Sequence, residues 1–120
     1  ILMEAKEDHP FVQVELMMPI LPLVRVPDVD QAIEMAVRVE HGNRHTAMMH
    51  SRNVEKLTKM AKLIQTTIFV KNGPSYAGIG VGGEGYTTFT IAGPTGEGLT
   101  SAKSFARRRR CVLAGGMYVR

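Results

Sequence analysis

The chain has 120 residues, of which 44% are hydrophobic and 22% charged. This length suits one compact domain, and no apolar run approaches the roughly 20 residues that a membrane-spanning helix requires, so we expect no membrane partner. The net charge is +4, but four of the fifteen basic residues form the run Arg107–Arg110. If this run is a strand, its arginines point alternately to both faces and form no continuous groove for a phosphate backbone, so we expect no nucleic-acid partner.

The start of the chain and its single cysteine bear on where the protein resides. The chain starts at Ile1, and its first residues lack the basic and apolar stretches of a secretory signal peptide. We therefore expect the chain to be part of a longer polypeptide. Cys111 is the one cysteine, so no internal disulfide can form, which suits a reducing compartment. We expect a cytoplasmic location.

The first expected elements are a strand and a helix. Residues 20–26 are nearly continuously apolar, which is typical of a strand buried on both faces, with Pro22 near its start or on an edge. Asp28 follows as a helix cap, and Gln31 stands where a capping box places its second residue. The predicted helix runs over residues 29–40.

Two further strands and a second helix complete a repeating pattern. The first helix carries an apolar stripe and stops at Gly42, which suits a left-handed terminus. Strands are predicted over residues 45–50 and 66–70, with a helix between them that starts at Ser51 or Asn53. The apolar stripes of the two helices consist of Val29, Ala32, Ile33, Ala36 and Val37, and of Val54, Leu57, Ala61 and Ile64.

Strand, helix, strand, helix and strand with short connections predict an α/β fold with a three-layer-type parallel sheet. Residues 72–98 are rich in glycine, which predicts a long loop over the end of the sheet, where binding sites are usually found. A short helix over residues 99–105 and a final strand over residues 107–113 follow. We therefore divide the chain into a main part, residues 1–106, and a terminal strand segment, residues 107–120.

Cysteine and histidine are the first candidates for chemistry. An activated thiolate is a strong nucleophile, but Cys111 falls in an expected strand away from any histidine, where free cysteines are commonly small buried hydrophobes. His41, His45 and His50 straddle a helix end, a turn and a strand, so they do not share one face. We expect no metal site and no catalytic residue in this chain.

Glycines and one carboxylate are the candidates for binding. The series Gly78, Gly80, Gly82, Gly83 and Gly85 follows a strand but leads into no prompt helix, so it is a weak match to a dinucleotide-binding loop. A ligand-facing loop and a merely flexible loop are equally compatible with it. Glu15 lies just ahead of a predicted buried strand, placed either to accept from a sugar hydroxyl or to form a surface salt bridge.

Several stretches resemble one enzyme family. Residues 15–22, Glu-Leu-Met-Met-Pro-Ile-Leu-Pro, resemble the Glu-x-x-x-Pro stretch of the aldehyde dehydrogenase superfamily. The similarity is closer to its CoA-acylating branch, the acetaldehyde and propionaldehyde dehydrogenases of ethanolamine and propanediol utilisation. The stretches that carry this closer similarity are His45–Ala47, His50–Asn53, Phe69–Pro74, Gly82–Gly85, Pro94–Gly98 and Thr100–Ala102.

This resemblance implies an oxidoreductase that converts an aldehyde, NAD and coenzyme A to acyl-CoA and NADH through a cysteine thiohemiacetal. In the superfamily that cysteine and the dinucleotide-binding fold precede the Glu-x-x-x-Pro stretch. The chain would then be the C-terminal part of the catalytic domain, inactive without the remainder of the same polypeptide. By position, Glu15 would bind the nicotinamide ribose, Met17 would pack beside the nicotinamide, and Ile79 would line the aldehyde entrance.

The resemblance also implies a homo-oligomer in which residues 107–113 add an edge strand to a neighbouring subunit's sheet. The enzymes it resembles further suggest a bacterial microcompartment as a possible location within the cytoplasm. The competing interpretation is a non-catalytic, homo-oligomeric interaction module. A cysteine and a glycine-rich βαβ unit upstream would distinguish the enzyme from this module.

Overall fold

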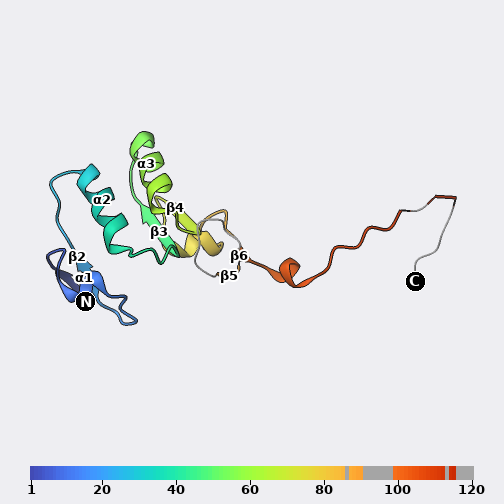
Figure 1. The fold of residues 1–120 in the computed structure, drawn as a ribbon, viewed down its shortest axis with the longest axis horizontal. Coiled ribbons are helices and arrows are strands. Elements are labelled where there is room, and N and C mark those ends of the chain that lie inside the picture. Colours follow the sequence, from blue (N-terminus) through green and yellow to red (C-terminus); the bar gives the residue numbers. More distant parts are fainter. Residues whose placement is uncertain (86, 91–98, 113, 116–120) are drawn as a thin grey trace.

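The computed structural model in Figure 1 describes residues 1–85, 87–90, 99–112 and 114–115. The fold is a small α/β arrangement of short strand pairs with helices packed between and against them (Figure 1). In chain order the elements are β1 (Leu2–Glu4), α1 (Pro10–Gln13), β2 (Leu21–Leu23), α2 (Val29–Val39), β3 (Thr46–Met49), α3 (Val54–Ile64), β4 (Ile68–Lys71), the 3-10 helix η1 (Ser75–Ile79), β5 (Phe89–Thr90), β6 (Leu99–Thr100) and the 3-10 helix η2 (Ala102–Phe105).

The parallel pair β1–β2 opens the chain, and the sequence pattern showed only its second strand. Leu2 pairs with Leu21 and Glu4 with Leu23. The strand predicted over residues 20–26 is shorter than expected, because β1 ends at Glu4 and offers no partner beyond this register. The four-residue helix α1 between the strands is too short to show apolar periodicity, which is why the pattern did not predict it.

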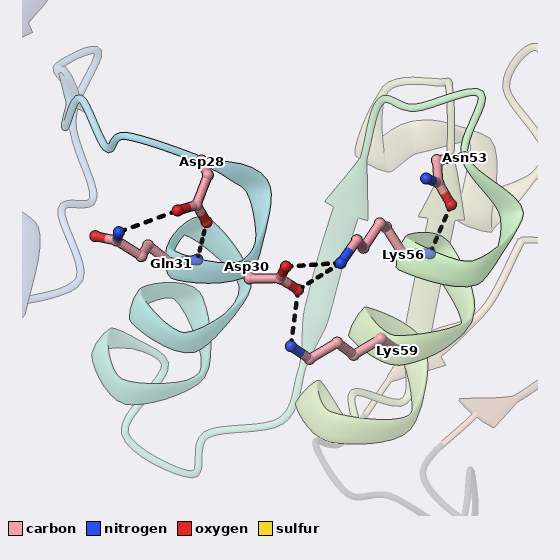
Figure 2. Close-up of polar contacts among 6 residues, drawn as sticks. All are labelled: Asp28, Asp30, Gln31, Asn53, Lys56 and Lys59. Carbon is pink, nitrogen blue, oxygen red and sulfur yellow. Dashed lines mark hydrogen bonds and ion pairs between the residues drawn. The ribbon is translucent and has the colours of Figure 1, made fainter.

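Helix α2 begins where its cap predicts. The Asp28 carboxylate accepts the backbone N–H of Gln31 at 2.9 Å, and the Gln31 side-chain amide donates to the same carboxylate at 3.1 Å (Figure 2). Gln31 therefore contacts the carboxylate of Asp28 and not its backbone N–H. At the other end His41 and Gly42 are both in the left-handed region, with φ of 53° and 77°. The predicted end of the helix at a left-handed Gly42 is confirmed, and His41 just before it is left-handed as well.

The unit β3–α3–β4 agrees with the predicted order. β3 and β4 pair in parallel, with Thr46 opposite Ile68 and Met49 opposite Lys71. Helix α3 is capped by Asn53, whose side-chain oxygen accepts the backbone N–H of Lys56 at 3.1 Å (Figure 2). Of the two capping residues proposed for this helix, Asn53 caps the helix itself.

A single parallel sheet through all the predicted strands is not formed in the described chain. The pairs β1–β2 and β3–β4 are separate two-stranded sheets, and β5 and β6 form a third, antiparallel pair. Helix α2 uses its one apolar stripe against α3 and β3–β4, where Ile33 packs with Met60 and Ile64. The stripe is therefore not available to hold β2 beside β3, and the two pairs stay apart (Figure 1).

A side-chain amide joins the carboxyl ends of β3 and β4. Asn72 accepts the backbone N–H of Ser51 at 2.7 Å and donates to the Ser51 carbonyl at 2.9 Å. Its backbone is left-handed, with φ of 54°, a conformation that asparagine tolerates better than most residues. These two hydrogen bonds hold Ser51, which leads into α3, next to Asn72, which begins the glycine-rich segment.

The C-terminal part differs from the predicted pattern in two places. The helix expected over residues 99–105 is instead the strand β6 followed by η2, because Leu99 and Thr100 pair with β5. Residues 107–112 form no strand, since a strand needs a hydrogen-bonded neighbour and they extend away from the other elements (Figure 1). Leu113, the last residue of the predicted strand, lies outside the described residues, as do Pro94–Gly98 of the glycine-rich loop.

The core is small. Its buried members are Ile33, Leu57, Met60, Ile64, Ile68 and Val70. Three of the predicted stripe positions are among them, whereas Val54 is 66% exposed and Met60 occupies the buried position instead. The described part of the chain holds no helix that is both long and apolar enough to cross a membrane.

An ion-pair cluster links the two long helices. Asp30 of α2 accepts from Lys56 at 2.6 Å and from Lys59 at 2.8 Å, both of α3 (Figure 2). The hydrogen bonds from these two ammonium groups lower the pKa of Asp30 from 3.8 to about 2. The cluster thus stabilises the folded chain only while the Asp30 carboxylate is ionised.

This cluster predicts how stability depends on pH. The folded pKa lies below the unfolded value, so the contribution of Asp30 is complete above pH 3.8 and is lost as the pH falls towards 2. Asp30→Asn should lower the urea midpoint at pH 6 and have little effect near pH 2. The partly exposed pair should also weaken in high salt. Asp8→Asn, an exposed aspartate in none of the described ion pairs, is the control. A pH-independent difference for Asp30→Asn would contradict the assignment.

Candidate functional site

Glu15 lies in the exposed segment between α1 and β2 and lines a cavity of about 440 Å³. The opposite wall of this cavity comes from the loop that follows α2, with His41 and His45, and from the first residue of β3, Thr46. Sequence analysis proposed Glu15 but assigned the histidines no role. The structure brings His41 and His45 to the same cavity as Glu15.

Backbone geometry explains why the loop after α2 is so placed. The Glu40 carboxylate accepts the backbone N–H of Gly42 at 2.9 Å and also that of Arg44. With His41, Gly42 and Arg44 all at positive φ, the chain turns sharply instead of continuing the helix. This turn presents His41 and His45 to the cavity, and no helical or strand periodicity could have indicated it.

Ile79 lines a second cavity, of about 270 Å³. His45 and Thr46 line this cavity as well, so the two cavities share these two residues at the start of β3. The other side is formed by η1, with Ser75 and Tyr76. Glu15 and Ile79, which are 64 positions apart in the sequence (79 − 15), therefore lie on two adjoining cavities.

Met17 is not brought to either of these cavities. Its side chain is 89% exposed and lines neither of them. Its contact with a cofactor stays a prediction.

The glycine-rich segment packs closely upon itself. A Cβ on Gly85 would lie 2.4 Å from the backbone of Gly78, and one on Gly83 would lie 2.8 Å from the Ala77 side chain. The Gly85 N–H also donates to the Ala77 carbonyl at 3.3 Å. Close packing of the loop on η1 accounts for glycine at these two positions, and it does not decide between a ligand-facing and a flexible loop.

The remaining candidates lie elsewhere. Cys111 is exposed in the extended C-terminal segment. His50 lines a different cavity, between α2, β3 and α3. Among the described residues no group of three His, Cys, Asp or Glu side chains is arranged to hold a metal ion. The cavity that Glu15 lines therefore carries two carboxylates, Glu15 and Glu40, and the two imidazoles of His41 and His45.

Comparison with known proteins identifies relatives of this chain. The chain is 63% identical over 115 residues to the propanal dehydrogenase (CoA-propanoylating) of Citrobacter freundii, covering 96% of this chain and 25% of that protein. It is 59% identical over 113 residues to the acetaldehyde dehydrogenase (acetylating) EutE of Escherichia coli, covering 94% and 24%. The chain thus spans about a quarter of the length of these relatives.

Solved structures of two propionaldehyde dehydrogenases are also similar to this chain. The propionaldehyde dehydrogenase of Rhodopseudomonas palustris, with bound CoA and an acylated cysteine, is 80% identical, with a TM-score of 0.83 over 93% of this chain and 26% of that one. A propionaldehyde dehydrogenase from a Clostridium phytofermentans fucose utilisation microcompartment is 56% identical, with a TM-score of 0.81 over 99% and 27%. The aldehyde dehydrogenase family model matches residues 1–99. The chain belongs to the aldehyde dehydrogenase family.

Proposed function

We propose that this chain is the C-terminal part of the catalytic domain of a CoA-acylating aldehyde dehydrogenase, which converts acetaldehyde or propionaldehyde, NAD and coenzyme A to acyl-CoA and NADH. Relatives named as propanal and acetaldehyde dehydrogenases, at 63% and 59% identity, support this assignment. NAD accepts the hydride in that reaction. The nucleophilic cysteine and the dinucleotide-binding fold would come from the remainder of the polypeptide, so these 120 residues alone are inactive.

The role of Glu15 follows from its place on the cavity. The observation that carries the proposal is that Glu15 faces a cavity which adjoins the one lined by Ile79. An ionised carboxylate accepts hydrogen bonds from two neighbouring hydroxyls, which is what orienting a ribose requires. Glu15 would hold the nicotinamide ribose, so that the ring is directed towards the second cavity.

Two further residues complete the proposed site. Ile79, at the end of η1, would line the entrance for the aldehyde, since an aliphatic wall favours a short apolar chain. Met17 would pack beside the nicotinamide, and its exposure leaves its side chain available for such a contact. Residues 107–120 would add a strand to a second copy of the chain, and the extended course of residues 107–112 agrees with this (Figure 1). The location would be the cytoplasm, within a bacterial microcompartment.

Glu15→Gln tests the proposal. An amide accepts with one oxygen only and carries no charge, so we expect about tenfold weaker NAD binding by the natural polypeptide that carries these residues. Isothermal titration calorimetry with NAD measures this change. Glu34→Gln, on the exposed side of α2, is the matched control and should bind as the unmodified protein does. Equal NAD affinity for Glu15→Gln and the unmodified protein would refute the assigned role.

A further inference from the structure

The side-chain amide of Gln13 connects two parts of the site. Its Nε2 donates to the backbone carbonyl of Glu7 at 2.5 Å, and its Oε1 lies 3.0 Å from Nε2 of His41. A backbone carbonyl can only accept, so the nitrogen of the amide must face Glu7 and the oxygen must face His41. The Nε2 atom of His41 must therefore carry the proton.

Glu7, whose backbone carbonyl accepts the hydrogen bond from Gln13, is itself held in place through its side chain. Arg38 of α2 donates to both carboxylate oxygens of Glu7, at 2.9 and 3.1 Å. The Arg38 guanidinium also lowers the pKa of the Glu7 carboxyl. Such a bidentate pair fixes orientation as well as distance. A continuous series of contacts thus joins α2 to α1 and then to the loop that bears His41.

The consequence concerns the other ring nitrogen of His41. In a neutral imidazole with its proton on Nε2, Nδ1 is an acceptor. The described part of the chain gives this Nδ1 no hydrogen-bond partner, and His41 lines the same cavity as Glu15. The other titratable groups on this cavity are Glu15, Glu40 and His45.

We propose that Gln13 is a positioning residue that holds His41 as the Nε2–H tautomer, so that its Nδ1 accepts a hydrogen bond from a hydroxyl of the nucleotide bound at Glu15. The inference rests on the proposed function. It assigns the cavity one acceptor beyond the carboxylate, and it gives α1, which the sequence pattern did not reveal, a purpose in the site.

Two substitutions of Gln13 separate its two hydrogen bonds. Gln13→Glu keeps an acceptor for the His41 N–H but loses the donor to Glu7. Gln13→Lys keeps a donor to Glu7 but cannot accept from His41. We expect the NAD affinity of the natural polypeptide to fall less than about threefold in Gln13→Glu and about tenfold in Gln13→Lys, the cost of one lost hydrogen bond. Gln31→Lys, the same change on the exposed face of α2, should bind within about twofold of the unmodified protein.

Long-range proton–nitrogen NMR of the histidine rings supplies a readout independent of binding. The proton should be on Nε2 of His41 in the unmodified protein and in Gln13→Glu, and on Nδ1 in Gln13→Lys, because the ammonium donates to Nε2. Weaker binding by Gln13→Glu than by Gln13→Lys, or equal binding by both, would overturn the proposal, as would an unchanged tautomer in Gln13→Lys. If Glu15→Gln binds NAD normally, the proposed function fails, while the ring spectra still report on the contact between Gln13 and His41.

Discussion

Ile33→Ala is expected to lower the free energy of unfolding by about 2–5 kcal/mol, because the lost methyl groups leave a cavity that a close-packed interior fills poorly. Ile33 is 2% exposed and packs with Met60 and Ile64, so it joins α2 to α3 at the centre of the core. With so few buried side chains, such a loss is a large part of the total stability. Urea denaturation followed by far-UV circular dichroism measures it.

Val29→Ala is the matched control for this prediction. Val29 belongs to the same predicted stripe of α2 but is 38% exposed. Its truncation removes less buried area, so we expect a loss below about 1 kcal/mol. If both variants lose the same stability, the packing of α2 on α3 is not the main source of the core's stability.

Gly85→Ala is the second change with a large expected effect. A Cβ at this position would lie 2.4 Å from the carbonyl carbon and oxygen of Gly78 and 2.5 Å from the Ala77 oxygen. These are backbone atoms, which cannot turn aside as a flexible side chain can, so the loop must move away from η1. We expect a loss of about 3 kcal/mol, the upper part of the range for overpacking. Thermal unfolding measures the loss.

This displacement should also affect the proposed aldehyde entrance. Gly78 precedes Ile79 in η1, so a loop that is displaced from η1 changes the surroundings of the second cavity. In the natural polypeptide we expect KM for propionaldehyde to rise. Gly73→Ala is the control within the same segment, because its Cβ would meet Val70 and Ala77 side chains at the ordinary distances of 3.4 and 3.5 Å. A similar loss of stability in both variants would contradict the assigned role of close packing at Gly85.

The site shows how a small number of contacts can join distant parts of a chain. Glu15, His41 and His45 line one cavity, and His45 and Thr46 continue into the cavity that contains Ile79. A ribose on the first cavity and a short aldehyde on the second would thus be neighbours. The roles proposed for Glu15 and Ile79 rest on this arrangement of the two cavities.

The sequence by itself determined the features that depend on one turn or one strand. Asp28 and Asn53 cap α2 and α3 as their side chains predict, since a cap needs only the next three residues. The buried positions Ile33 and Ile64 follow from helical spacing, and Gly42 from the left-handed stop. Resemblance of short motifs indicated the aldehyde dehydrogenase family, which the family match confirms.

Only the tertiary structure decided which distant residues meet. Gln13 and His41 are 28 positions apart, and their contact depends on the pairing of β1 with β2 and on the sharp turn after α2. Pro10 at the first position of α1, capped by His9, was the one local signal of that helix, and four residues show no periodicity. Likewise, β2 is not paired with β3 because the single apolar stripe of α2 packs on α3 and β3–β4, a choice among packings that no local pattern encodes.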